Sequence, residues 1–280
     1  MSRHLYPMEF RQEVVVISDV HLGTYGSAAA QLVSYLKSIK PKVLILNGDI
    51  IDIWQFNKRY FPDDHMKVIR EIIRMLSKGT EVHYITGNHD ESLRRFSGFT
   101  LANFHLDNKV ILDLPTGKAW VFHGDVFDFS IKHSKWIAKL GGKGYDLLIL
   151  LNTFINWSLV KMGKERISIS KKVKDKVKGV ISYINNFEEN VAQIAMENDY
   201  RYVICGHIHQ PCIKDFTDEN GKVTTYLNSG DWVENNTALE YNNGEWKLIE
   251  FKEASVAKKE PKMDKVTIEL DMLLGSKDKQ

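Results

Sequence analysis

Five short polar motifs, each placed directly after a run of apolar and mostly β-branched residues, constrain the fold more than any other feature of this sequence. The motifs are Asp19-Val20-His21, Gly48-Asp49-Ile50-Ile51-Asp52, Gly87-Asn88-His89-Asp90, His123-Gly124-Asp125 and Gly206-His207-Ile208-His209. Apolar runs of this kind are typical of buried strands, and ligands bind at the carboxyl ends of the strands in an α/β sheet. The sequence therefore predicts five strands whose ends bring these polar side chains to one place.

The amino-terminal part of the chain alternates between strand-like and helix-like segments. The expected elements are strands at Glu13–Ser18, Lys42–Leu46 and Glu81–Thr86 and helices near Ala28–Ile39 and His65–Ser77. Such alternation predicts parallel strands with helices packed on the sheet. Two further strands, Lys109–Leu112 and Lys118–Phe122, are separated by a short turn with proline and glycine and are expected to form a hairpin.

The middle of the chain, from Val126 to about Asn198, changes to a helical pattern. The expected helices are Ile131–Leu140, Tyr145–Met162 and a long helix ending at Met196. Strands are expected again at Ile213–Phe216, Lys222–Leu227, Thr237–Tyr241 and Trp246–Glu250. We therefore interpret residues 1–125 and 199–251 as one domain, 126–198 as a helical lid insertion, and 252–280 as a polar tail that we expect to be disordered.

The composition fits a soluble globular protein, with 43% hydrophobic and 26% charged residues, and a formal net charge of +2 excludes no class of partner. Cys205 and Cys212 are the two cysteines, so no disulfide framework is predicted and a reducing cytosol is the natural setting. The amino terminus lacks an apolar stretch typical of a signal peptide, and Tyr145–Val160 is too short and polar to span a bilayer. We expect a cytoplasmic protein, with peripheral contact to the inner face of the membrane left open.

The polar motifs together offer oxygen and nitrogen donors for metal ions. Two divalent cations about 4 Å apart repel strongly and need a bridging carboxylate, for which Asp49 is the candidate. Asp19 and His21, two residues apart, can bind one metal together, and His207 and His209 repeat that spacing. The expected ligands are Asp19, His21, Asp49, Asn88, His123, His207 and His209. These donors suit manganese, iron or zinc, and we take Mn²⁺ as the first candidate.

The charge of such a centre indicates the class of substrate. Two divalent cations and two aspartates leave a charge of about +2, which favours an anion. A phosphate ester fits, because the metals can hold its oxygens and lower the pKa of a bridging water towards ~7. The leaving oxygen needs a proton, and His89, outside the ligand set, is placed to supply it or to stabilise charge on the phosphoryl oxygens.

From Glu13 to Glu250 the ordered motifs resemble the calcineurin-like metallophosphoesterase superfamily. The resemblance implies an α/β fold with two packed β-sheets flanked by helices, an αββα sandwich, with a helical lid insertion. It implies one metal held by Asp19, His21, Asp49 and His209 and another held by Asp49, Asn88, His123 and His207. It also implies that Asp52 orients His89 by a hydrogen bond.

Within the superfamily the chain looks most like the UDP-2,3-diacylglucosamine hydrolases of lipid A synthesis, in its size, its helical insertion and its Gly230-Asp231-Trp232. Those enzymes cleave a diphosphate to give UMP and a diacylated sugar phosphate, and their insertion houses the acyl chains. The substrate contacts implied are Asn88, His89, Leu151 and Phe154. Two departures limit the likeness: those hydrolases usually carry arginine at the position of His89, and Cys-Thr-Asp-Asp where this chain has Val126-Phe127-Asp128-Phe129.

Alternative functions follow from the same residues. The second hypothesis is a soluble phosphodiesterase or phosphatase acting on nucleotides or another polar lipid. A non-catalytic scaffold is disfavoured, because all seven expected ligands are present. Twelve basic and three acidic residues lie between Lys132 and Lys178, which suits an anionic membrane surface but equally a solvated lysine-rich face. No groove of aromatic and basic residues is evident, so nucleic acid is not an expected partner. The sequence makes no prediction of the oligomeric state.

Overall fold

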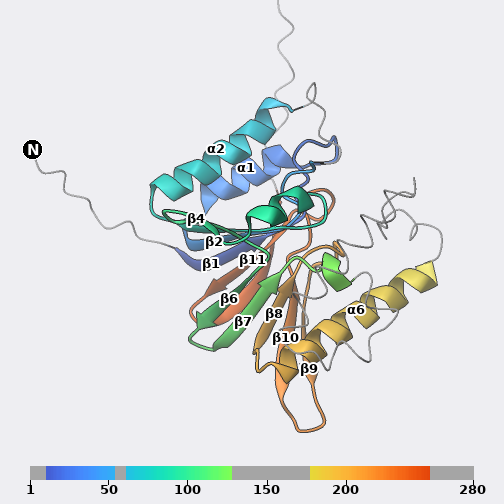
Figure 1. Ribbon diagram of the computed structural model, residues 1–280. Coiled ribbons are helices and arrows are strands. Elements are labelled where there is room, and N and C mark those ends of the chain that lie inside the picture. Colours follow the sequence, from blue (N-terminus) through green and yellow to red (C-terminus); the bar gives the residue numbers. More distant parts are fainter. Residues whose placement is uncertain (1–10, 54–60, 128–176, 253–280) are drawn as a thin grey trace, which may run out of the picture.

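Two β-sheets lie face to face and helices cover both outer faces, so that the layers follow the order helix, sheet, sheet, helix (Figure 1). The computed structural model describes residues 11–53, 61–127 and 177–252 of the 280-residue chain. The predicted αββα sandwich is confirmed. Among the helices that these ranges contain, none combines the length and the hydropathy needed to cross a bilayer.

The first sheet has seven strands in the order β12-β11-β1-β2-β3-β5-β4. Their bounds are β1 Gln12–Ile17, β2 Pro41–Asn47, β3 Glu81–Ile85, β4 Phe99–Leu101, β5 Phe104–Asp107, β11 Thr237–Asn242 and β12 Glu245–Glu250. The pairs β1–β2, β2–β3 and β3–β5 are parallel, as the alternation of strands and helices predicts. The outer strands β4, β11 and β12 pair antiparallel with their neighbours.

Helices α1, Ala29–Ser38, and α2, Asp63–Ser77, cover the outer face of this sheet (Figure 1). Side chains alternate between the two faces of a strand, and β2 shows this clearly. Leu44 and Leu46 pack with Leu36 of α1 and Val68 of α2, whereas Ile45 points the other way into the apolar layer between the sheets. Both faces of β2 are therefore buried, which explains its continuous apolar sequence.

The second sheet has five strands in the order β6-β7-β8-β10-β9. Their bounds are β6 Lys109–Leu114, β7 Gly117–Phe122, β8 Tyr202–Cys205, β9 Cys212–Thr217 and β10 Val223–Asn228. The predicted β6–β7 hairpin is confirmed by its antiparallel register. Strands β7 and β10 are both parallel to β8. The carboxyl ends of β7 and β8 lie at the same edge of the molecule as the carboxyl end of β2 in the first sheet.

Helix α6, Val177–Glu197, covers the outer face of the second sheet (Figure 1). Its buried Phe187, Val191 and Ala195 belong to the same apolar cluster as Phe122 of β7 and Tyr226 of β10. The predicted long helix ending at Met196 is thus confirmed, and this part of the segment 126–198 packs on the sheet. The other two expected helices, together with Leu151 and Phe154, lie outside the described residues.

Four short elements were not among the expected ones: β4, β5, and the 3-10 helices η1, Glu91–Phe96, and η2, Asp125–Phe127. All three residues of β4 are exposed, and β5 has a single buried residue, Leu106. These strands exist because they add to the edge of a sheet that is already formed. A four-residue segment with one buried side chain carries too little periodicity to reveal a strand.

Replacing Phe187 with alanine tests whether α6 belongs to the cooperative core. Phe187 is fully buried, and its ring lies against those of Phe127 and Tyr226. Phe187→Ala should lower the free energy of unfolding by about 3–5 kcal/mol, because it removes a large buried side chain and leaves a cavity. Gln193→Ala, at an exposed position of the same helix, should change it by no more than about 0.5 kcal/mol. Urea unfolding measures both, and equal effects would place α6 outside the core.

Candidate metal centre

Backbone hydrogen bonds join the loops that follow β1 and β2 to each other, and likewise the loops that follow β7 and β8. The Asp19 amide donates to the Gly48 carbonyl at 3.1 Å, and the His21 amide donates to the Asp49 carbonyl at 2.9 Å. The Gly206 amide donates to the His123 carbonyl at 2.9 Å. Backbone hydrogen bonds therefore hold the first motif against the second and the fourth motif against the fifth.

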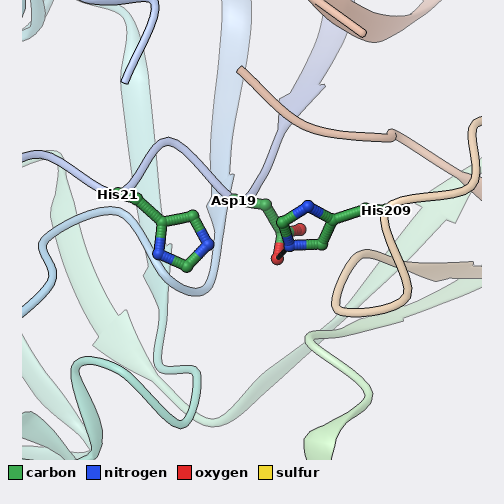
Figure 2. A group of neighbouring side chains, drawn as sticks. All are labelled: Asp19, His21 and His209. Carbon is green, nitrogen blue, oxygen red and sulfur yellow. Dashed lines mark ion pairs between the residues drawn. The ribbon is translucent and has the colours of Figure 1, made fainter. Parts of the chain in front are cut away.

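Asp19, His21 and His209 form the first group of side chains, with potential ligand atoms all within 4.8 Å of one another. The Asp19 carboxylate lies against the His209 ring, with the His21 ring to one side of them, and the three residues come from the loops after β1 and β8 (Figure 2). His209 Nε2 is 3.1 Å from Asp19 Oδ1, and the His207 amide donates to Asp19 Oδ2 at 3.0 Å. One oxygen of Asp19 is thus held by the backbone while the other faces a histidine.

Asp49, His123 and His207 form the second group, with ligand atoms again within 4.8 Å of one another. His123 Nε2 lies 3.2 Å from Asp49 Oδ2, and the other ring nitrogen, Nδ1, is 2.9 Å from the Asn47 carbonyl oxygen. Asp49 also belongs to a third group with His21 and His89. It is therefore the carboxylate that lies between the two histidine clusters, as a bridging ligand must.

The buried atoms in these groups fit cations better than they fit hydrogen bonds with one another. Asp19 Oδ1 and His123 Nε2 are buried and form no well-aligned hydrogen bond, although each lies close to a polar atom of its group. Buried polar atoms without a partner are costly. A cation shared by each group would satisfy them, and the oxygen and nitrogen donors suit a first-row divalent metal.

Five of the expected ligands have a backbone conformation that side chains rarely adopt. The φ angles of Asp19, His21, Asp49, His207 and His209 lie between 52° and 65°. Non-glycine residues in this left-handed region cost about 1–3 kcal/mol each and are concentrated at functional sites. Strand ends in this conformation turn sharply, which brings Asp19 and His21 into one group and sends His207 and His209 to different groups.

Gly87 and Gly206 allow the backbone to pass directly against two of the carboxylates. A Cβ at Gly87 would overlap Asp49 Oδ1, and a Cβ at Gly206 would overlap Asp19 Oδ2. Glycine is needed at both positions for space. The loop containing Asn88 lies just after Gly87, and the adjacent His89 amide donates to Asp49 Oδ1 at 2.7 Å. Asn88 thus lies in a loop that is fixed to the Asp49 carboxylate.

His89 and Asp52 make the contact that the sequence resemblance implies. His89 Nδ1 is 2.8 Å from Asp52 Oδ2, and Asp52 is 1% exposed. The other ring nitrogen, Nε2, lies 4.0 Å from Asp49 Oδ2, so it faces the carboxylate that lies between the groups. Burial opposes protonation of His89, but the hydrogen bond to Asp52 and the charge of Asp49 outweigh it and raise its pKa. Bound cations would act in the opposite direction.

Asp90 and Tyr84 have a positioning role that the sequence did not reveal. Asp90 is fully buried and accepts hydrogen bonds from the Ile50 amide at 3.0 Å, the Gly87 amide at 2.5 Å and the Tyr84 hydroxyl at 2.6 Å. Burial and the charge of Asp49 raise the pKa of Asp90 to about 6. The residue joins the loop after β2 to the loop after β3. The place of Asp90 in the third motif indicated a role at the centre, whereas the sequence around Tyr84 indicated only a strand.

Asp231 and Arg94 support the centre from two other sides. Asp231 Oδ2 lies 3.6 Å from His209 Nδ1, and Asp231 Oδ1 accepts the Val233 amide at 2.8 Å. Arg94 Nη2 lies 2.5 Å from Asp125 Oδ2 and so connects η1 to the fourth motif. Partners of this kind orient ligand side chains around a metal. Gly230-Asp231-Trp232 was noted in the sequence only as a point of likeness.

Comparison with known proteins shows what this chain is similar to. The family model described as calcineurin-like phosphoesterase matches residues 13–211. The UDP-2,3-diacylglucosamine hydrolase of Coxiella burnetii (strain RSA 331 / Henzerling II) is 25% identical over 253 residues, which cover 86% of this chain and 98% of the relative. That of Aeromonas salmonicida (strain A449) is also 25% identical and covers 83% of this chain and 91% of the relative. A solved dimetal phosphatase from Danio rerio has a TM-score of 0.40 at 14% identity, covering 87% of this chain and all of that one.

The protein is therefore a metal-dependent phosphoester hydrolase. It belongs to the calcineurin-like phosphoesterase family, because the family model covers most of the chain, from β1 to the residues that follow the fifth motif. The expected family resemblance is confirmed. The described residues bring six of the seven expected ligands into the two groups, and Asn88 lies in the adjoining loop.

A methyl group at position 206 should disturb the centre while leaving the fold in place. Gly206→Ala would push against Asp19 and Ser18, so the variant should lose bound metal and most of its activity. Gly221→Ala is the control, since its Cβ would meet open space and only its positive φ would be strained. Elemental analysis of both purified variants measures metal per chain. Full metal content in folded Gly206→Ala would contradict the close approach described above.

Proposed function

We propose that this protein hydrolyses a diphosphate of the UDP-2,3-diacylglucosamine type, giving UMP and an acylated sugar phosphate, with two divalent cations. The observation that carries the proposal is the position of Asp49 between two histidine clusters. Relatives named UDP-2,3-diacylglucosamine hydrolase, which match most of the chain, support the choice of substrate. Mn²⁺ is the first candidate for both cations, and iron or zinc would suit the same donors.

The ligands proposed for the first cation are Asp19, His21, Asp49 and His209, and those for the second are Asp49, Asn88, His123 and His207. When bound, the pair of cations would supply a nucleophile at neutral pH and neutralise the phosphoryl oxygens. Asp49 would hold the cations close together. The charge of the site would then attract an anionic diphosphate rather than a neutral ester.

His89 would act on the substrate, with Asp52 as the residue that positions it. The contact between Asp52 and His89 Nδ1 fixes the ring and leaves Nε2 directed towards Asp49. From there Nε2 can donate a proton to the leaving oxygen or stabilise the negative charge that develops on the phosphoryl group. Asn88 would contact the same oxygens from the adjoining loop.

The proposal extends to the segment 126–198 as a lid that covers the acyl chains. Helix α6 anchors its carboxyl-terminal part on the second sheet. The residues proposed to line the acyl chamber, Leu151 and Phe154, and most of the lysines proposed to contact an anionic membrane surface lie outside the described residues. The same proposal places the protein in the cytoplasm, at the inner face of the membrane, with residues 1–125 and 199–251 forming the catalytic domain.

A soluble phosphodiesterase or phosphatase acting on nucleotides, or on another polar lipid, is the second candidate. One feature favours it: His89 stands where the UDP-2,3-diacylglucosamine hydrolases that the chain resembles usually carry arginine. A histidine supplies a proton, whereas an arginine supplies a fixed charge for a phosphate. Histidine at position 89 therefore suits a substrate whose leaving group must be protonated. It is less suited to one whose phosphates must be held by a fixed positive charge.

A substrate panel separates the two candidates. Protein loaded with Mn²⁺ should release UMP from UDP-2,3-diacylglucosamine with a higher kcat/KM than it shows for UDP-glucose, ADP-ribose or bis-p-nitrophenyl phosphate. UDP-glucose is the unacylated control: it keeps the diphosphate and uridine and lacks the acyl chains together with the sugar nitrogen that carries one of them. Equal kcat/KM for the acylated and unacylated substrates would reject the acyl specificity and favour the soluble phosphodiesterase.

Substitution of His89 and Asp52 tests their proposed roles. His89→Gln should keep both cations while turnover falls by roughly 10²–10⁴-fold, because a proton donor outside the ligand set has been removed. Hydrolysis of bis-p-nitrophenyl phosphate, whose leaving group needs no proton, should fall less. If Asp52 acts through His89, Asp52→Asn should add little to His89→Gln in the double variant. Independent, additive losses would show that Asp52 has a separate role.

A further inference from the structure

Glu81, His83 and His105 form another cluster of metal-ligating side chains, built from residues outside the five motifs. Their potential ligand atoms lie within 4.8 Å of one another. Glu81 and His83 belong to β3, and His105 belongs to β5. The two strands are parallel, and their register pairs His83 directly with His105. The cluster therefore depends on a pairing between two segments that are separate in the sequence.

The strand pattern places these side chains on the inner face of the seven-stranded sheet. Val82 and Tyr84 pack in the cluster beneath α1 and α2, and Ile85 packs between the sheets. Since successive side chains alternate, Glu81 and His83 share the face of Ile85. The side chains are partly accessible to solvent: the exposed fraction of the side chain is 13% for His83, 24% for His105 and 46% for Glu81. A cation from solvent can therefore reach them.

The Nε2 atoms of both imidazole rings point at the same oxygen of the Glu81 carboxylate. His83 Nε2 lies 3.0 Å from Glu81 Oε1, and His105 Nε2 lies 3.4 Å from it. Zinc binds nitrogen and oxygen at about 2.0–2.1 Å, so its ligand atoms in a tetrahedron stand about 3.3 Å apart. The spacing matches, and it is also close to the 3.1 Å and 3.2 Å between Asp and His atoms in the metal centre.

The pairing of β3 with β5 holds the two imidazole rings side by side. The rings are stacked, with centroids 4.7 Å apart and planes at 19°. Burial lowers the pKa of His83, and the charge of a protonated His105 would lower it further, against the opposing effect of Glu81. His83 Nδ1 is buried and makes no hydrogen bond within the described residues. His105 Nδ1 lies 3.2 Å from Thr100 Oγ1, a contact that can fix the ring of a metal ligand.

We propose that Glu81, His83 and His105 bind one divalent cation of the Zn²⁺ type, with water completing its coordination, and that this cation joins β3 to β5. Two imidazoles and a carboxylate are a ligand set that zinc uses. The site is separate from the phosphoester centre. Because β3 leads into the loop of Asn88 and His89, a cation here would hold the strand that carries those residues. A hydrogen-bonded trio without metal is the alternative.

The zinc content of matched variants tests the proposal. Wild-type protein and Glu81→Gln are equilibrated with the same buffered free Zn²⁺ and then analysed for metal. The wild type should hold about one zinc ion per chain more than Glu81→Gln, which keeps the size of the side chain but loses its charge. Glu245→Gln is the control, since Glu245 is also a strand glutamate with an exposed side chain. It should match the wild type.

A site-specific measurement accompanies the metal analysis. Zinc should shift the ring ¹⁵N signals of His83 and His105 in the wild type and leave them in place in Glu81→Gln. Equal zinc content in the three proteins, or histidine shifts confined to the five motifs, would overturn the proposal. The comparison depends on a difference between variants, so it stands whether or not the phosphoester centre binds metal. Equal melting temperatures without zinc would show that Glu81→Gln leaves the fold intact.

Discussion

The ionised carboxylate of Asp49 is the interaction on which the rest of the site depends. Burial opposes its ionisation, but the charges of His123, His21 and His89 outweigh this and hold its pKa well below the usual value. A buried charge is tolerated only where it is paired and hydrogen-bonded. Asp49 meets this condition through its contacts with His123 and the His89 amide. The loops after β2, β3 and β7 therefore meet at one anion.

The pairing of buried carboxylates with histidines also determines how the centre would exchange protons for cations. Burial opposes protonation of His123 and His209, yet the nearby carboxylates outweigh it: Asp49 raises the pKa of His123 well above the usual value, and Asp19 raises that of His209 to about 9. Without metal, each histidine therefore holds a proton that a cation must displace. The affinity for metal consequently falls as the pH is lowered.

The sequence indicated which side chains would be brought together, because these residues follow long buried strands. Apolar runs such as those of β1 and β2 indicate where a strand ends, and parallel topology then brings these ends together. Contacts that depend on register could not be predicted in this way. Tyr84 is one case, since nothing in its strand indicates a hydrogen bond to Asp90. The pairing of His83 with His105 is another, because β5 itself was not recognised.

The local strain of the centre is offset by rigid supports around it. Left-handed conformations at five ligand positions are each unfavourable by about 1–3 kcal/mol, so the chain needs compensating contacts nearby. Asp90 accepts hydrogen bonds from the loops after β2 and β3 and a third from Tyr84 of β3, and Asp231 accepts the amides that follow it while facing His209. These two buried carboxylates keep the loops in their strained form before any cation binds. A cation then meets ligands already in place, and little of its binding energy is spent on ordering them.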